Sequence, residues 1–204
     1  MAPSGLLKKP ASYEELRQVP DHMVAEILNG ELHVTPRPAL PHANVASVLG
    51  IDIGGPFHRG RGGPGGWWIL DEPELHLHAD IVVPDIAGWL RSRLPAIPNV
   101  AFLTIAPDWL CEVLAPSTER MDRATKLAIY AREGVSHVWL TNPINETLEV
   151  LALENGRWTL LATHEGAVTV RAAPFEAIEL ELSALWTPAS PPDAGAAPSP
   201  PSES

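Results

Sequence analysis

Three acidic residues interrupt apolar segments of the sequence, where a purely structural role does not account for them. They are Glu112 in residues 109–114, Asp85 in residues 81–87 and Glu26 in residues 24–28. A buried carboxylate is costly unless it is paired or bound to a metal. Each residue alone is explained more simply by a half-exposed strand that turns the acid to solvent. The three together favour a set of oxygen ligands for Mg²⁺ or Mn²⁺.

Lys126 is the basic residue that could act together with these acids. It lies in a helical stretch after Glu112, where an ammonium aimed at the site could stabilise phosphate charge or orient a metal-activated water. Asp122 lies four residues before Lys126, so an ordinary surface ion pair has the same spacing. On spacing alone the surface pair is the simpler interpretation.

Two other groups of residues could bind a metal or act as nucleophiles. His76, His78 and Asp80 alternate along an expected strand, a spacing compatible with a transition metal. A polar, solvent-facing strand surface explains the same alternation more simply. Ser117 and Thr118 precede a helix and are expected to cap it rather than act as nucleophiles.

The elements that must position these residues can be predicted from local patterns. We expect helices at residues 12–19, 41–53 and 118–134, the first from the capping box of Ser12 and Glu15. Asn-Gly pairs at 29–30 and 155–156 predict hairpins between residues 24–28 and 31–34, and between 148–153 and 158–163. Further strands are expected at residues 75–83, 109–114, 138–141 and 177–182. This order favours an α+β or mixed α/β domain on a mostly antiparallel sheet.

Length and composition indicate one domain. The chain has 204 residues, of which 45% are hydrophobic, enough for one core. We expect a flexible N-terminus over residues 1–11, a single domain over 12–186 and a disordered tail over 187–204. Fifteen of the last 18 residues are Pro, Ala, Ser or Gly, a composition that cannot offset its ordering entropy.

Cysteine content and hydropathy narrow the class of protein. The single cysteine, Cys111, excludes a disulfide framework and a four-cysteine zinc site. No apolar run approaches the roughly 20 residues that span a bilayer. Lys8 and Lys9 are not followed by the apolar stretch of a secretion signal. A cytoplasmic protein without a membrane partner is therefore expected.

The charge balance is acidic. Lys and Arg number 14 against 25 Asp and Glu, a formal net charge of −11. Such a surface repels phosphate backbones and argues against avid, non-specific nucleic-acid binding. An acidic protein can still act on nucleic acid if its carboxylates hold divalent cations.

Motifs spread along most of the chain carry a family resemblance. They are Glu-Ile-Leu-Asn-Gly-Glu-Leu at 26–32, His42, Val-Pro-Asp-Ile at 83–86, Pro-Asp-Trp-Leu-Cys-Glu-Val-Leu-Ala-Pro-Ser-Thr at 107–118, Asp122, Lys126, Tyr130, Gly-Val at 134–135 and Trp-Leu at 139–140. Together they resemble the Uma2 family, formerly a domain of unknown function, which is placed among the PD-(D/E)XK nucleases. The resemblance covers residues 13–186, and its most specific segments surround Asp85 and run from Glu112 to Lys126.

The resemblance implies a restriction-endonuclease-like core, a central mixed β-sheet flanked by helices with a metal site at one end. By position, Asp85 matches the aspartate of the Pro-Asp motif and Glu112 the acid on the next core strand. The superfamily lysine belongs two residues after that acid, where this chain has Leu114. Lys126 on the following helix is the candidate for its role, and Glu26 adds a third metal ligand.

The activity implied by the resemblance is Mg²⁺-dependent hydrolysis of DNA by an endonuclease, with Mn²⁺ as a substitute ion. The three carboxylates would hold one or two ions, which activate water and stabilise the scissile phosphate. Lys126 would position that water or neutralise the transition state. The resemblance assigns supporting roles to the remaining matched residues, His42, Asp122 and Tyr130.

Two other functions stay open from the sequence. The acidic charge, the lack of a basic stripe and the displaced lysine also fit a non-catalytic nuclease-fold protein that acts as a protein-interaction module. A metal-dependent hydrolase of a small phosphoester would keep the site and change the substrate. Convergence of Glu26, Asp85, Glu112 and Lys126 on one place separates the site-based functions from the interaction module. A homodimer would suit double-strand cleavage, although no motif indicates it.

Overall fold

A computed structural model describes residues 9–187 of the chain. The expected tail after residue 187, and residues 1–8 of the expected flexible N-terminus, lie outside the described residues. Within the described part, the Ala11 N–H donates a 2.8 Å hydrogen bond to the carbonyl oxygen of Gly30. The described chain therefore starts against the first β-hairpin.

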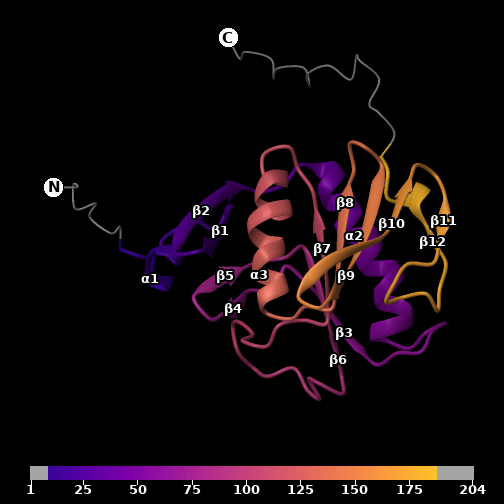
Figure 1. Ribbon diagram of the computed structural model, residues 1–204, viewed down its shortest axis with the longest axis horizontal. Helices are drawn as coiled ribbons and strands as arrows, with labels where there is room; N and C mark the ends of the chain where they lie inside the picture. The colour runs from indigo at the N-terminus through magenta and orange to yellow at the C-terminus, as the bar shows by residue number, and fades with distance from the viewer. Residues whose placement is uncertain (1–8, 188–204) are drawn as a thin grey trace, which may run out of the picture.

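A six-stranded sheet forms the centre of the molecule (Figure 1). Its order is β10-β9-β8-β7-β6-β3, with β3 at Trp67–Asp71, β6 at Ile86–Leu90, β7 at Trp109–Val113, β8 at His137–Asn142, β9 at Thr147–Glu154 and β10 at Arg157–Glu165. Neighbouring strands are antiparallel except β7 and β8, which are parallel. The expected central mixed sheet is confirmed.

A second sheet of four strands packs beside the first, in the order β2-β1-β5-β4. Its strands are β1 at Met23–Leu28, β2 at Glu31–Pro36, β4 at Leu75–Leu77 and β5 at Asp80–Val82. A small third sheet pairs β11 at Thr169–Val170 with β12 at Leu180–Glu181, so the strand expected at 177–182 is much shorter.

Both predicted Asn-Gly hairpins are present, as β1–β2 and β9–β10. The turn residues all have positive φ: 51° for Asn29, 80° for Gly30, 51° for Asn155 and 75° for Gly156. Asn tolerates this backbone region and Gly adopts it without steric cost, so the two-residue turn matches the strand twist.

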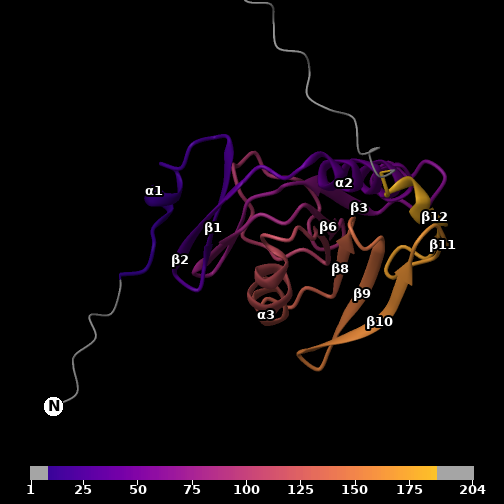
Figure 2. The same ribbon diagram turned by 90° about the horizontal axis from the view of Figure 1, so that it is seen from above.

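Helices lie on both faces of the large sheet, and the short first helix packs against β1 of the four-stranded sheet. Their bounds are α1 Tyr13–Leu16, α2 Leu40–Ile53, the π-helical η1 Gly54–His58 and η2 Met121–Lys126, α3 Leu127–Arg132 and the 3₁₀ turn η3 Leu182–Ala184. Figure 2 shows α2 and α3 on opposite sides of the sheet. The predicted capping box of Ser12 and Glu15 is confirmed. No helix in the described part has the length and apolar character needed to cross a bilayer.

Strand β7 is buried on both faces and separates two hydrophobic cores. Trp109, Cys111 and Val113 pack into the core that contains Val45 and Leu49 of α2. The alternate residues Leu110 and Leu114 pack into the core that contains Ile129 and Tyr130 of α3. Because strand side chains alternate between faces, Glu112 points toward the α3 side of the sheet.

The prediction of one continuous strand over residues 75–83 is wrong. The segment is a hairpin of β4 and β5, and His78 in the turn has a φ of 57°. The turn lets the Asp80 carboxylate accept the Asn29 N–H at 2.5 Å and pair with Arg132 at 2.6 Å. These partners are distant in sequence, so alternation along residues 75–83 cannot reveal them.

Phe175 should be a key packing residue of the α2-side core. Its ring is fully buried, with its centroid 4.5 Å from that of Phe57 and 4.9 Å from that of Trp109. Phe175→Ala should lower the free energy of unfolding by about 3–5 kcal/mol, measured by urea denaturation. The exposed Ile51→Ala should cost less than about 0.5 kcal/mol. Equal effects of the two substitutions would contradict this packing role.

Candidate active site

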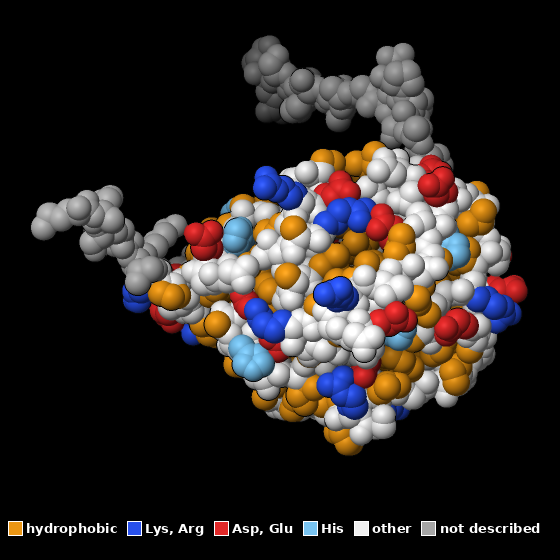
Figure 3. All heavy atoms as spheres, in the orientation of Figure 1, with side chains coloured by type: hydrophobic (Ala, Val, Ile, Leu, Met, Phe, Trp, Pro, Cys, Tyr) orange, Lys and Arg blue, Asp and Glu red, His pale blue; other side chains and the backbone are white. Residues whose placement is uncertain are grey.

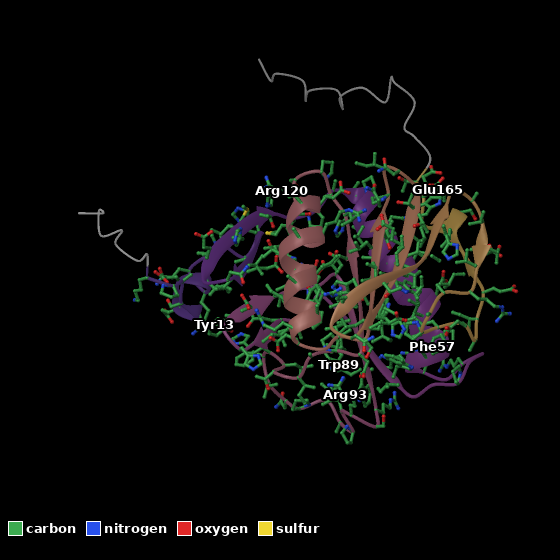
Figure 4. The ribbon with its side chains drawn as sticks, viewed as in Figure 1. Tyr13, Phe57, Trp89, Arg93, Arg120 and Glu165 are labelled. Atoms are coloured by element: carbon green, nitrogen blue, oxygen red, sulfur yellow. The ribbon has the colours of Figure 1, made fainter. Side chains whose placement is uncertain are left out.

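A cavity of about 300 Å³ lies where the two large sheets meet the start of η2. Strand β1, the β2–α2 connection, the β5–β6 link, the end of β7 and η2 all contribute to its wall. Its ionisable lining residues are Glu26, Arg37, His42, Glu72, Asp85, Glu112, Asp122 and Lys126. The structure therefore brings every expected site residue except Tyr130 to the wall of one cavity. Arg120 directly precedes η2. Its label near the top of Figure 4 therefore marks the edge of the molecule at which η2 begins, and Arg93 lies near the opposite edge.

Lys126 lies at the centre of the buried charges. Its Nζ atom is 2.8 Å from Oε1 of Glu112, 3.1 Å from Oε1 of Glu26 and 3.8 Å from Oδ1 of Asp122. The residue is only 3% exposed. The surface ion pair with Asp122 is therefore the wrong interpretation. The same i,i+4 spacing here belongs to a buried helix face, and Asp122 is the most distant of the three acids.

The helix that carries Lys126 is placed by the topology of the large sheet. Parallel strands β7 and β8 need a crossover connection, and η2 with α3 supplies it. The crossover covers the face toward which Glu112 points, and it begins as a π-helical turn, a feature frequent at functional sites. From the next turn, the Tyr130 hydroxyl donates a 2.5 Å hydrogen bond to Oε1 of Glu112.

Glu112 is an acid in an apolar strand, as its sequence context indicated. It is 3% exposed and Glu26 is 5% exposed, so the half-exposed alternative is wrong for both. Burial raises the pKa of Glu112 well above its ordinary value, the nearby ammonium of Lys126 opposes this, and Asp122, Asp85 and Glu26 add to the increase.

The pKa of Lys126 is also shifted. Burial alone would lower it, but the charges of Glu112 and Glu26 outweigh desolvation and hold it well above its ordinary value. Lys126 is therefore a protonated cation that is shared between two carboxylates.

The link between β5 and β6 joins the two sheets at the cavity. The Val83 N–H donates to Oε1 of Glu26 at 2.8 Å, which attaches the link to β1. Two residues later, Oδ2 of Asp85 accepts the Val113 N–H at 2.7 Å, which attaches it to the end of β7. The Pro-Asp motif thus lies between two strands rather than inside the apolar strand expected from residues 81–87.

His42 in the first turn of α2 faces the free side of Asp85. Its Nε2 atom is 3.3 Å from Oδ1 of Asp85, whose side chain is 17% exposed. Burial would lower the pKa of His42, but the hydrogen bond and charge of Asp85, with a contribution from Asp122, raise it. The imidazole can therefore hold the Asp85 carboxylate in one orientation.

The donor set fits a hard divalent cation in chemical type. Five carboxylates line the cavity, those of Glu26, Glu72, Asp85, Glu112 and Asp122, and Mg²⁺ and Mn²⁺ prefer such oxygen ligands. The acids are not arranged as a coordination shell: among the described residues, no group of three or more His, Cys, Asp or Glu is placed to hold a metal. The ammonium of Lys126 occupies the cation position between Glu26 and Glu112.

The alternative histidine site does not form. Nε2 of His76 contacts Glu74 at 2.7 Å and its ring stacks on Phe102, whereas Nδ1 of His78 contacts Glu133 at 2.8 Å. The β4–β5 turn separates these side chains, and neither histidine lines the cavity. Thr118 does line it and hydrogen-bonds the side chain of Asp122.

Two cavity residues were not expected from the sequence, Arg37 and Glu72. They form an ion pair with a 2.8 Å distance between Nη1 and Oε2. The only local signal is that Arg37 lies between Pro36 and Pro38, which predicts a stiff turn but no chemistry.

The fold and site define the class of protein. Asp85 directly precedes strand β6, Glu112 lies on the neighbouring strand β7, and Lys126 lies on the helix that follows β7. This arrangement on a mixed sheet is a restriction-endonuclease-like nuclease architecture. A profile described as "Uma2: Putative restriction endonuclease" matches residues 10–184. The chain therefore belongs to the Uma2 family, as its motifs indicated.

A solved structure has a similar fold. It is the crystal structure of "a putative nuclease belonging to DUF820" from Anabaena variabilis ATCC 29413, with a TM-score of 0.70. The two sequences are 21% identical, and the match covers 87% of this chain and 98% of that chain. No curated protein matches the chain. The similarity to the solved structure supports the fold assignment.

Removal of the buried ammonium should destabilise the protein strongly. Lys126→Met would leave Glu26 and Glu112 buried without a counter-charge, at a cost of about 3–5 kcal/mol in urea unfolding at pH 7. Adding Glu112→Gln should recover at least about 1 kcal/mol, because it removes one unpaired charge. If Lys126→Met cost less than about 1 kcal/mol, the ammonium would not be a structural counter-ion.

Proposed function

We propose that the chain is a Mg²⁺-dependent endonuclease that hydrolyses DNA phosphodiester bonds, with Mn²⁺ able to replace Mg²⁺. The observation that carries the proposal is the convergence of Glu26, Asp85, Glu112 and Lys126, from four separate segments, on one cavity. Membership of the Uma2 family supports a nuclease. Burying so many charges is costly for stability alone, whereas a cation site explains why they are kept together.

Each cavity residue has a part in this chemistry. Asp85 and Glu112, with Glu26, would hold the ion, which supplies a water of lowered pKa and stabilises charge on the scissile phosphate. Lys126 retains its proton. An ion held by Glu26 and Glu112 would displace its ammonium from between them, which would let the ammonium neutralise the phosphate oxygens as charge develops. His42 and Tyr130 orient Asp85 and Glu112 through the contacts described above.

The acidic surface makes a cation necessary for this substrate. The net charge is −11, and on the face shown in Figure 3 Lys and Arg side chains are interspersed with Asp and Glu rather than gathered into a basic stripe. A bound divalent ion reverses the local potential that a phosphate meets. Cleavage should therefore depend on the ion for substrate binding as well as for water activation.

One observation favours a second function, a non-catalytic nuclease-fold protein that binds a protein partner. Lys126 already neutralises Glu26 and Glu112, so the cluster is stable as an internal ion-pair network. Under this alternative the cavity would neither bind a divalent ion nor require one for function.

Plasmid nicking with purified protein separates the two functions. Wild type should convert supercoiled DNA to open-circular and linear forms with Mg²⁺ or Mn²⁺, and EDTA should abolish this. Asp85→Asn and Glu112→Gln should each lower the rate by about 100-fold or more, since each removes a carboxylate that would hold the divalent ion. The control Glu176→Gln changes an exposed acid outside the cavity and should cut normally. Cleavage that persists in both cavity variants would contradict the assignment of the site.

A further inference from the structure

The Arg37–Glu72 ion pair lies at the rim of the catalytic cavity. Both residues line the 300 Å³ cavity, and both also line a neighbouring groove of about 580 Å³, whose other charged lining residues are Arg17, Asp21 and Glu74. The side chains of Arg37 and Glu72 are 52% and 47% exposed. The pair therefore separates the buried site from the surface that a long substrate would follow.

The backbone on both sides of the pair is constrained. Pro36 and Pro38 restrict the conformation of Arg37 between them. Glu72 has a φ of 42°, which is unusual for a residue other than Gly or Asn, and its N–H donates to the carbonyl oxygen of Asp85 at 3.0 Å. Strained backbone of this kind clusters at functional sites. Here the strained residue is Glu72, which binds Arg37 through its carboxylate and the Pro-Asp motif through its backbone N–H.

Arg37 is the exposed cation of an otherwise acidic wall. Among the described residues that line the cavity, the only Lys or Arg side chains are those of Arg37 and Lys126. Lys126 is buried and engaged by two carboxylates. A guanidinium has five N–H donors, and Arg37 uses one on Glu72 and one on the carbonyl oxygen of Asp21. Within residues 9–187 these are its only side-chain hydrogen bonds, so the remaining donors can bind an oxyanion.

The N-terminus of α2 adds positive potential beside Arg37. The N–H groups in the first turn of a helix have no intrahelical partners, although in α2 the second residue, Pro41, has no N–H. The N-cap of this helix is Ala39, which provides no side-chain oxygen to cap them. Pro38 and Ala39 line the cavity next to Arg37, so the helix end and the guanidinium face the same space.

We propose that Arg37 binds a backbone phosphate of the DNA strand next to the scissile phosphate, and that Glu72 occupies this place in the free protein. Oε2 of Glu72 accepts one N–H of the guanidinium, and a phosphate oxygen can accept the same donor in a charge-assisted hydrogen bond. Substrate binding exchanges the carboxylate for the phosphate and opens the rim between cavity and groove. This inference rests on the proposed nuclease function and assigns a substrate-binding residue to it.

The test measures affinity for a fluorescein-labelled DNA duplex by anisotropy, with Ca²⁺ as the hard cation, for wild type and three variants of the pair. Arg37→Ala should weaken binding about 10-fold, which is the loss of affinity expected when one charge-assisted hydrogen bond is removed. It should also reduce the slope of log K against log salt concentration by about 0.9, one phosphate contact. Glu72→Gln should tighten binding by about 2- to 5-fold, because an exposed ion pair no longer competes.

The opposite signs distinguish a phosphate contact from a structural ion pair. If the pair only stabilised the fold, Arg37→Ala and Glu72→Gln would shift binding in the same direction, in step with their melting temperatures. In the Arg37→Ala/Glu72→Gln double variant, the gain from Glu72→Gln should disappear. Arg157→Ala removes an exposed arginine outside the cavity and controls for the loss of overall charge.

The outcomes separate this inference from the proposed function. If wild type binds DNA and Arg37→Ala binds as Arg157→Ala does, the role of Arg37 is overturned while the nuclease proposal stands. A gain from Glu72→Gln that persists without Arg37 would also overturn it. If wild type neither binds nor cuts DNA, the proposed function fails and this inference fails with it.

Discussion

The buried ammonium of Lys126 is the interaction on which the rest of the architecture depends. It lies within 3.1 Å of both Glu26 and Glu112 at the wall of the cavity, with only 3% of the residue exposed. A buried charge without its partner is far more costly than the pair. Strand β1, strand β7 and the crossover helix must therefore pack together, since each supplies one member of the network. The same network fixes how far apart the acids of the site lie.

The Pro-Asp link converts that packing into a shaped cavity. It leaves the four-stranded sheet after β5 and enters the six-stranded sheet at β6. Along it, the Val83 N–H is held by Glu26 and the Asp85 carboxylate accepts the Val113 N–H. The carboxylates of Glu26 and Asp85 are thus each fixed by a backbone N–H in addition to their side-chain contacts. Such positioning suits a site that must present several oxygens to one cation.

Sequence patterns predicted the parts of this arrangement that have local causes. The Asn-Gly turns and the Ser12–Glu15 capping box are determined by residues that are neighbours in the sequence. Glu112 is recognisable without knowledge of the fold, because it is an acid within an apolar run. The burial of Lys126 could not be predicted from spacing, because i,i+4 pairs with Asp122 look identical on a surface and in a core. The roles suggested for the matched acids came from the family resemblance, and they stay predictions.

Other features depend on tertiary contacts alone. The turn at His78 exists because Asp80 binds groups from distant segments, which no alternation pattern contains. The Arg37–Glu72 pair joins residues 35 positions apart, and an arginine between two prolines has no chemical signature. The rim of the cavity, where the substrate would be recognised, was therefore the part of the site least accessible from sequence.

The central claim is that this carboxylate cavity is a divalent-cation site, and calorimetric titration of Mn²⁺ into metal-free protein tests it most directly. Wild type should bind with a dissociation constant on the order of micromolar to millimolar. Asp85→Ala, confirmed as folded by circular dichroism, should lose that binding. Equal binding by the two proteins would contradict the claim because it would place the ion elsewhere. No binding by wild type would identify the buried network as an internal ion pair only.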